Sequence, residues 1–318
     1  MSSWNGMPPE IKYMIVDRMD LCTRTNLKKC SKSSKNLVDS VPLYIEELDL
    51  RDEYDTHGED IISRSLEIDY LNVKTDGWHL NLKKFGDRKW NEPKRVKLSD
   101  NVKKYNSLYL IMKSFIGLLS VKNVRIERLG ICYLKYDSEF DNTTIRAESV
   151  LIVCKEFEGM LKFIKLLSSD VKYIAAYDHL NDIENYINPS TESIGVIPAI
   201  VNAKELDLQM RNNITDEELL SFKCTELNLE FSHITSNGIK QLIRKIINQD
   251  YPKKSSFHIQ GLYTSAMFLE VVEGLDYTII KDDSKSKKAK IIFGVGKSLL
   301  VSFIAHYDDG NRFFIYVE

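Results

Sequence analysis

Short strand-like segments alternate with helical patterns over most of the chain beyond residue 104, and this alternation sharply limits the folds that the chain can adopt. A helical pattern through Leu119 comes first, and the strands that follow are separated by polar turns and further apolar-periodic stretches. The expected strands lie at residues 124–132, 150–154, 171–175, 205–209, 226–230 and 257–260. Such alternation predicts the α/β class, in which helices cover a sheet of mainly parallel strands.

Two of these units are nearly alike and indicate a repeat. Leu206-Asp-Leu208 and Leu227-Asn-Leu229 begin 21 residues apart, and each precedes a capped helical pattern. The first helix opens with the capping box Thr215–Glu218, and the second, Thr235–Ile247, carries five apolar residues on one face. Repeat spacings of roughly 21 to 35 residues approach those of leucine-rich repeats, although no intact consensus is present. We expect an irregular leucine-rich-repeat-like strand-helix solenoid, with a non-repeat parallel α/β sheet as the alternative.

Strand-like segments also flank this alternating region. On its N-terminal side, strand-like pieces separated by polar stretches lie at residues 45–50, 66–73 and 95–98. At the other end, strands are expected at residues 277–281, 291–293, 299–305 and 312–317, with a polar loop at 282–288 and a turn at 308–311. Because the end of a solenoid exposes its core, we interpret the last strands as a C-terminal β cap or a small docking surface.

Residues 7–40 form a separate helical unit. Pro8 and Pro9 suit the first turn of a helix, and Asp20 and Ser31 are suited to cap a second and a third helix. The apolar positions of the three helices are Ile11, Met14, Ile15 and Met19, then Leu21, Leu27 and Cys30, then Leu37, Val38 and Val41. Three short helices bury too little surface to be stable alone, so this unit is expected to pack on a partner or on the rest of the chain.

Composition excludes several classes of protein. The 318 residues are 43% hydrophobic and 28% charged, which is typical of a soluble globular chain and not of a disordered or fibrous one. The net charge of −2 gives the whole protein no general attraction to nucleic acid or to an anionic membrane. Five scattered Cys and the lack of a signal-peptide pattern predict a reducing compartment, either the cytoplasm or the nucleus.

No local motif predicts catalysis, a metal site or a cofactor. Gly294–Ser298 resembles the end of a phosphate-binding loop, but Ile291 stands where the first Gly is needed and a strand-like stretch follows, so we expect a hairpin turn. The six His and five Cys occur in no ligand or nucleophile spacing. The basic stretch Lys281–Lys290 is interpreted as a solvated loop, with a nuclear-import patch as the weaker reading. An enzyme whose site is assembled from distant residues stays open as an alternative.

The N-terminal residues resemble a known motif. Trp4-x-x-Met7-Pro8-Pro9-Glu10-Ile11, followed by Lys29-Cys30-Ser31-Lys32 and then Leu37-Val38, resembles the F-box, most closely in the form found in nematode F-box proteins. Ser34 stands where many F-boxes carry Trp. Residues 101–318 are similar in layout to the F-box-associated region called the FTH domain, above all from Ser256-Phe-His-Ile259 to Phe314-Ile-Tyr-Val317.

The resemblance implies a division of the chain and a function. It implies an F-box at residues 4–45, a β-rich connecting region at 46–100 and an FTH-like α/β substrate-binding region at 101–318. The protein would be a non-catalytic substrate receptor of a Skp-cullin-F-box ubiquitin ligase; the alternative is a protein-interaction scaffold whose F-box no longer recruits the ligase. The residues expected to meet the Skp adaptor, or to hold the helices that do, are Met7, Pro8, Ile11, Ile15, Leu27, Leu37 and Val38. The competing interpretation is that these residues, Ile15 and Leu27 first, form only the core of a helical subdomain.

Overall fold

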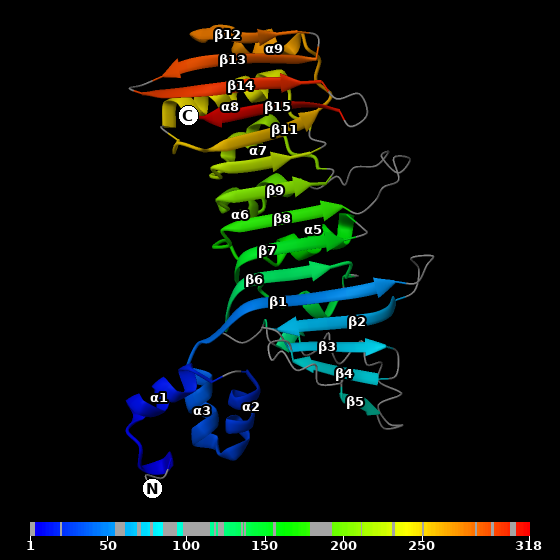
Figure 1. Ribbon diagram of the computed structural model, residues 1–318, viewed down its shortest axis with the longest axis vertical. Coiled ribbons are helices and arrows are strands. Elements are labelled where there is room, and N and C mark those ends of the chain that lie inside the picture. The colour runs from blue at the N-terminus through cyan, green and yellow to red at the C-terminus, as the bar shows by residue number, and fades with distance from the viewer. Residues whose placement is uncertain are drawn as a thin grey trace. The chain divides into compact units, whose positions relative to one another are not determined.

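The computed structural model divides the chain into two compact units (Figure 1). The first comprises residues 1–129 and 142–147, and the second comprises residues 130–141 and 148–318. The residues that the structure describes are 4–19, 21–54, 61–68, 71–76, 79–84, 94–97, 115–117, 119, 124–134, 136, 138–154, 157–178, 193–210, 212–230, 233–249, 251–283, 285–293, 296–305 and 310–318. The observed class is mixed α/β, with N-terminal helices followed by a sheet-rich region, as predicted.

The first unit begins with a short 3₁₀ turn, η1 (Trp4–Gly6), and three helices, α1 (Pro9–Asp17), α2 (Leu21–Cys30) and α3 (Lys32–Ser40). Pro8 precedes α1 and Pro9 occupies its first turn, where no N–H is needed. Ser31 caps α3 by accepting a 3.0 Å hydrogen bond from the Ser34 N–H. The three predicted helices are therefore confirmed, whereas the predicted cap Asp20 lies outside the described residues.

Antiparallel strands follow these helices in the first unit. They are β1 (Leu43–Tyr54), β2 (Ile61–Ile68), β3 (Leu71–Asp76), β4 (His79–Lys84) and β5 (Lys94–Lys97), paired in chain order. The single strand predicted at residues 66–73 is wrong, because Ile68 pairs with Leu71 and Leu66 with Val73 across a reversal. Apolar residues are frequent on both sides of this reversal, so the stretch is predicted as one strand, although the alternation changes phase between residues 70 and 71. Of the helix expected through Leu119, only residues 115–117, which are helical, and residue 119 are described.

Parallel strands dominate the second unit. The last residues of β6 (Val124–Cys132) belong to the second unit. The elements that follow are η2 (Ser138–Phe140), β7 (Ala147–Cys154), β8 (Tyr173–Asp178), β9 (Glu205–Gln209), β10 (Glu226–Leu229) and β11 (Ser256–Gly261). The strands from β7 to β11 pair in parallel, each with the next. The strand predicted at residues 171–175 begins two residues later, at Tyr173. These pairings bring β8, β9 and β10 side by side.

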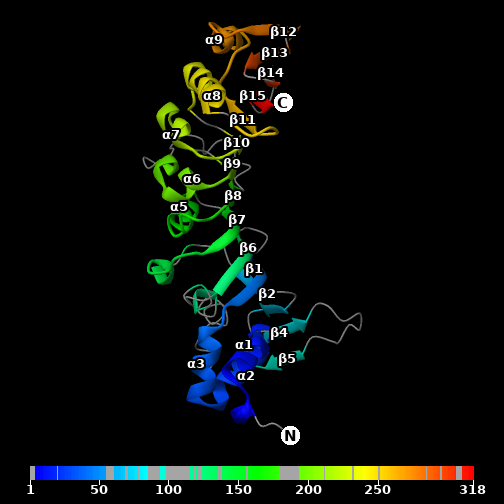
Figure 2. The same cartoon turned by 90° about the vertical axis from the view of Figure 1, so that its left-hand side faces the viewer.

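Helices cover one side of this sheet in the second unit (Figure 2). They are α5 (Phe157–Lys165), η4 (Ile194–Val196), α6 (Pro198–Asn202), α7 (Asp216–Ser221), α8 (Ser236–Gln249) and α9 (Met267–Val272). The capping box of α7 is present, since Thr215 accepts from the Glu218 N–H while the Glu218 side chain accepts from the Thr215 N–H. Ile239, Leu242, Ile243 and Ile246 of α8 are buried, as predicted. Leu206, Leu208, Leu227 and Leu229 are the buried residues of β9 and β10.

The last four strands are antiparallel and extend the same sheet beyond β11. They are β12 (Tyr277–Asp282), β13 (Ser286–Phe293), β14 (Lys297–Ile304) and β15 (Asn311–Val317), in the order β12-β13-β14-β15-β11. Phe293 pairs with Lys297, which confirms the hairpin predicted at Gly294–Ser298. Gly296 has a φ of 70°, a left-handed conformation that glycine adopts without strain.

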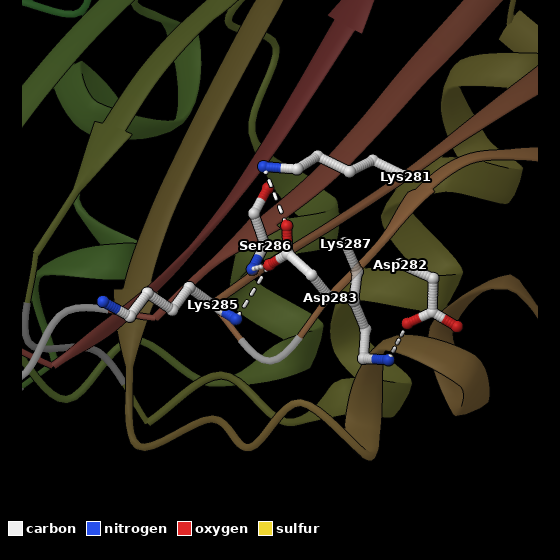
Figure 3. A network of polar contacts seen from close by, with 6 residues as sticks. All are labelled: Lys281, Asp282, Asp283, Lys285, Ser286 and Lys287. Carbon is white, nitrogen blue, oxygen red and sulfur yellow. Dashed lines mark hydrogen bonds and ion pairs between the residues drawn. The ribbon is translucent and has the colours of Figure 1, made fainter.

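The polar loop predicted at residues 282–288 is wrong, because Ser286 already begins β13 (Figure 3). Asp283 closes the reversal: its carboxylate accepts from the N–H groups of Lys285, at 2.9 Å, and Ser286, at 2.7 Å. Lys281 pairs with Asp283 at 3.0 Å, and Lys287 pairs with Asp282. The high density of lysines predicts a loop, but on this strand the lysine side chains are only partly buried and their charges reach solvent or carboxylates.

Candidate functional site

The helices of the first unit have a very small core. Val16, Val38 and Val41 form it, and Trp4, Met19, Leu27 and Leu37 pack against it while partly buried. Of the residues predicted to meet a partner, Val38 is therefore a core residue, and Leu27 and Leu37 lie beside it. Ile15 and Met7 are half-buried, whereas Pro8 and Ile11 are exposed. The predicted set thus divides into residues that hold the helices together and residues that are free to make a contact.

Helix α1 carries most of the exposed apolar surface of these helices. Ile11 is 44% exposed, Tyr13 43% and Met14 54%, whereas Val16 is fully buried. Ile11 and Met14 are three residues apart and therefore lie on one side of the helix. Met14 was assigned to the apolar face in the sequence pattern, but Tyr13 was missed because a single Tyr between apolar positions gives no periodic signal. The exposed apolar surface formed by Ile11 and Met14 is named the α1 surface below, and Tyr13, two residues from Ile11, lies on another side of the helix.

Arg24 of α2 hydrogen-bonds to backbone carbonyl groups near the ends of α1 and α3, a role that the sequence does not predict. Only 3% of the residue is exposed, and its guanidinium donates to the carbonyl oxygens of Met19 at 3.0 Å, Val41 at 3.0 Å and Asp17 at 3.2 Å. Burial lowers the pKa of Arg24, while the Asp17 carboxylate acts in the opposite direction. Arg24 thereby joins the end of α1 to the residue that follows α3. No sequence pattern marks an arginine that binds backbone carbonyls.

Ser34 lies where the related motif often carries Trp. It is 5% exposed, and its hydroxyl accepts a 2.9 Å hydrogen bond from the Ser31 hydroxyl. A buried Ser with a satisfied hydroxyl is stable here, but it contributes none of the contact area of an indole ring. The contact area of this helix must therefore come from other residues.

The side of the second unit's sheet that the described helices do not cover carries polar and aromatic side chains. Asp207 lies at the centre of a network on β8, β9 and β10: its carboxylate accepts from Tyr177 at 2.5 Å, Asn228 at 2.8 Å and Gln209 at 3.1 Å. The carboxylate and burial together raise the pKa of Tyr177, with burial the larger cause. These residues alternate with the buried leucines, so they share the uncovered face. This face of β8, β9 and β10, which no described helix covers, is named the β8–β10 face below.

Two carboxylates of this face lie directly opposite one another. Glu205 pairs with Glu226 in the register of β9 and β10, and Tyr173 of β8 is the next neighbour of Glu205. Both glutamates are exposed. Burial raises the pKa of Tyr173, and the charges of Asp207 and Glu205 raise it further. The β8–β10 face is therefore a negatively charged, tyrosine-bearing surface.

Further along the same side, β11 and β15 contribute a different set of groups. His258 contacts Phe314 edge to face with ring centroids 4.7 Å apart, and Arg312 lies 3.7 Å from Glu230. Burial lowers the pKa of His258, and Arg312 lowers it further, so the imidazole is neutral at pH 7. In the sequence these residues occupy ordinary strand positions, and no motif marks them. Only the antiparallel pairing of β11 with β15 brings residues 258 and 314 together.

A pocket lies at the ends of α7 and α8. Lys245 donates to the carbonyls of Leu220, at 2.9 Å, and Phe222, at 2.6 Å, so it caps the end of α7. Burial lowers the pKa of Lys245 and raises the pKa of the neighbouring Cys224 thiol to about 12. A thiol with that pKa is not a thiolate at neutral pH and is a poor nucleophile. Within the part of the chain that the structure describes, no group of three or more His, Cys, Asp or Glu is placed to hold a metal ion.

The described helices are short compared with a membrane-spanning helix. None of the helices in the described residues is long and apolar enough to cross a bilayer.

Comparison with known proteins identifies the N-terminal helices. Residues 4–46 match the F-box domain, so the chain carries an F-box at its N-terminus. The chain is also similar to an uncharacterised F-box protein of Caenorhabditis elegans, with 24% identity over 273 residues. The match covers 77% of this chain and 66% of the relative, so it spans just under two thirds of the relative's own length. No solved structure matches the chain.

Proposed function

We propose that this protein is a substrate-receptor subunit of a Skp-cullin-F-box ubiquitin ligase. The observation that carries the proposal is the F-box at residues 4–46, because F-box domains in general bind the Skp adaptor of such ligases and are not themselves catalytic. The receptor would make and break no bonds. Its contribution is positional: a substrate held beside a loaded conjugating enzyme has a greatly raised effective concentration of lysine.

The α1 surface supports docking to the adaptor. Its apolar residues are exposed on a helix whose opposite side holds the small core, so contact with a partner would bury them without disturbing the fold. Burial of apolar area contributes about 25 cal/mol per Å², which makes Ile11 and Met14 suitable anchors. Pro8 and Met7 flank this surface, while Leu27, Leu37 and Val38 support it from within.

The proposal assigns a role to each part of the chain. Residues 4–45 dock on the Skp adaptor and through it join the cullin complex, residues 46–100 connect, and residues 101–318, the FTH-like region, recruit a protein substrate. The recurring strand and helix of β8–α6, β9–α7 and β10–α8 support an irregular leucine-rich-repeat-like solenoid with β12–β15 as its cap. A solenoid offers a long uncovered sheet face to a protein partner. The cytoplasm or the nucleus is the proposed location.

Capture of the purified Skp adaptor by the full chain tests the docking step. Ile11→Asp with Met14→Asp places charges on the α1 surface and should abolish capture, since an unpaired carboxylate would be buried at the interface. Val196→Asp is the matched control: Val196 is 67% exposed in the second unit, so the variant should bind as the unaltered chain does. Circular dichroism checks that each variant is folded.

Two results would contradict the proposal: failure of the unaltered chain to capture the adaptor, or capture that Ile11→Asp with Met14→Asp leaves intact. The first result would favour the second candidate function, a protein-interaction scaffold whose F-box no longer recruits the ligase. Ser34 is the observation that favours this candidate, because the small side chain removes aromatic contact area from α3. Ser34→Trp capturing the adaptor where the unaltered chain does not would identify that residue as the cause.

A further inference from the structure

The β8–β10 face contains a pair of like charges, Glu205 and Glu226, that form no ion pair with another described residue. Glu205 and Glu226 are direct partners on neighbouring parallel strands, whose backbones lie about 4.8 Å apart. Like charges in such a position are destabilising. The next pair along the same strands, Asp207 and Asn228, is joined by a 2.8 Å hydrogen bond instead. The Asp207 carboxylate thus accepts hydrogen bonds from neighbouring side chains, whereas the carboxylates of Glu205 and Glu226 are exposed to solvent.

Two nearby lysines are engaged elsewhere. Lys172, just before β8, pairs with Glu148 at 2.8 Å, and Lys223, just before β10, donates to Asn202 at 2.7 Å. On this face the strands β8, β9 and β10 carry Glu205, Asp207 and Glu226 and no Lys or Arg; Lys204, directly before β9, alternates to the other side of the sheet. Natural sequences break a local rule of this kind mainly where function requires it. A positive charge supplied by a partner would remove the repulsion between Glu205 and Glu226.

Tyrosines border the same carboxylates. Tyr173 lies beside Glu205 in the register, and Tyr177 lies beside Gln209. Both rings are half-buried, so little side-chain entropy would be lost when a partner contacts them. The face of a Tyr ring attracts guanidinium and ammonium groups, and carboxylates pair with the same groups through hydrogen bonds. Aromatic rings beside carboxylates are therefore well suited to Arg and Lys side chains.

We propose that the β8–β10 face binds a basic segment of a partner protein, with its Arg or Lys side chains on Glu205 and Glu226 and against Tyr173. This inference rests on the proposed function in one respect, that the partner is the protein substrate of the receptor. Nucleic acid is a poor occupant because its phosphates would meet these carboxylates. A second copy of the chain would set the same acidic face against itself, which like-charge repulsion disfavours.

Selection from a random library of short peptides displayed on phage tests the inference with the full chain as bait. Selected peptides should be enriched in Arg and Lys, and fluorescence anisotropy then measures their affinity. Glu205→Lys with Glu226→Lys should weaken binding by about tenfold or more, because attraction is replaced by repulsion. Glu158→Lys with Glu217→Lys makes the same change of net charge at exposed positions on helices α5 and α7, and should leave binding within about twofold.

The outcomes separate this inference from the proposed function. Selected peptides that are not basic, or basic peptides that bind both double variants equally, would overturn it. A dimer that Glu205→Lys with Glu226→Lys dissociates would assign the face to a second copy and would equally overturn it. Capture of the Skp adaptor is measured on the same variants. If a variant loses peptide binding but still captures the adaptor, the change concerns the β8–β10 face alone. If the chain binds peptide but captures no adaptor, this inference stands and the receptor role does not.

Discussion

At the scale of single residues, the N-terminal helices depend on one buried cation. The core of Val16, Val38 and Val41 is small, so the helix ends need hydrogen bonds from side chains as well as apolar packing. Arg24 gives each of three carbonyl oxygens a donor, and Asp17 and Tyr13 also stabilise its charge. A surface-charge interpretation of Arg24 from the sequence would therefore be wrong. Arg24 thereby binds the end of the helix that carries the α1 surface.

Arg24→Met should destabilise these helices by ~2 kcal/mol, because three carbonyls lose charged donors and Met keeps most of the volume. Hydrogen exchange of the amides of α1 and α3 measures the change, which should appear as faster exchange in those helices and unchanged exchange in α8. Lys29→Met, at an exposed position of the same helix α2, is the control and should leave the exchange unaltered. Equal protection in both variants would show that the guanidinium contacts contribute no stability.

Glu226→Gln should raise the free energy of unfolding by ~0.2–1 kcal/mol, because it removes one charge of the pair with Glu205. Urea denaturation at low salt measures the gain, and high salt should shrink it by screening the repulsion in the unaltered chain. Glu217→Gln is the opposite case: Glu217 lies in the first turn of α7, where a negative charge is favourable, so this variant should lose ~0.3–1 kcal/mol. A loss of stability in Glu226→Gln would mean that the two glutamates do not repel one another.

At the scale of helices and strands, local signals were predictable and pairings were not. Helix α8 and the capping box at Thr215 follow from residues close in sequence, and both are confirmed. The hairpin of β2 and β3 is predicted as one strand because apolar residues are frequent on both sides of the reversal between Ile68 and Leu71, and the change of phase in their alternation is a weak signal. The β8–β10 face was invisible for a related reason: each strand shows only alternation, and Glu205 meets Glu226 only through tertiary register. The α1 surface lay within the predicted residues, but separating it from the core required the burial of each side chain.

The turn between β12 and β13 should lose its order in acid. The ion pair with Lys281, followed by the N–H groups of Lys285 and Ser286, lowers the pKa of Asp283 below its usual 3.8. A carboxyl with a depressed folded-state pKa stabilises the fold above pH 3.8, and this contribution disappears as the pH falls through the lower folded-state value. Nuclear magnetic resonance shifts of the Lys285 and Ser286 amides should titrate in that range. Asp283→Asn keeps an acceptor without the charge, so its amides should stay constant; equal titration in both chains would contradict the assignment.

At the scale of the whole molecule, the two proposed surfaces must be occupied at the same time. A receptor acts by tethering, and tethering requires the adaptor and the substrate on one chain together. The α1 surface belongs to the first unit and the β8–β10 face to the second, and they have no residue in common. A labelled selected peptide should therefore co-sediment with the adaptor-bound chain, and its affinity should be the same with and without the adaptor. Ile11→Asp with Met14→Asp should remove only the adaptor, and Glu205→Lys with Glu226→Lys only the peptide. Competition between adaptor and peptide would rule out a receptor of this kind, because each would displace the partner that it is meant to meet.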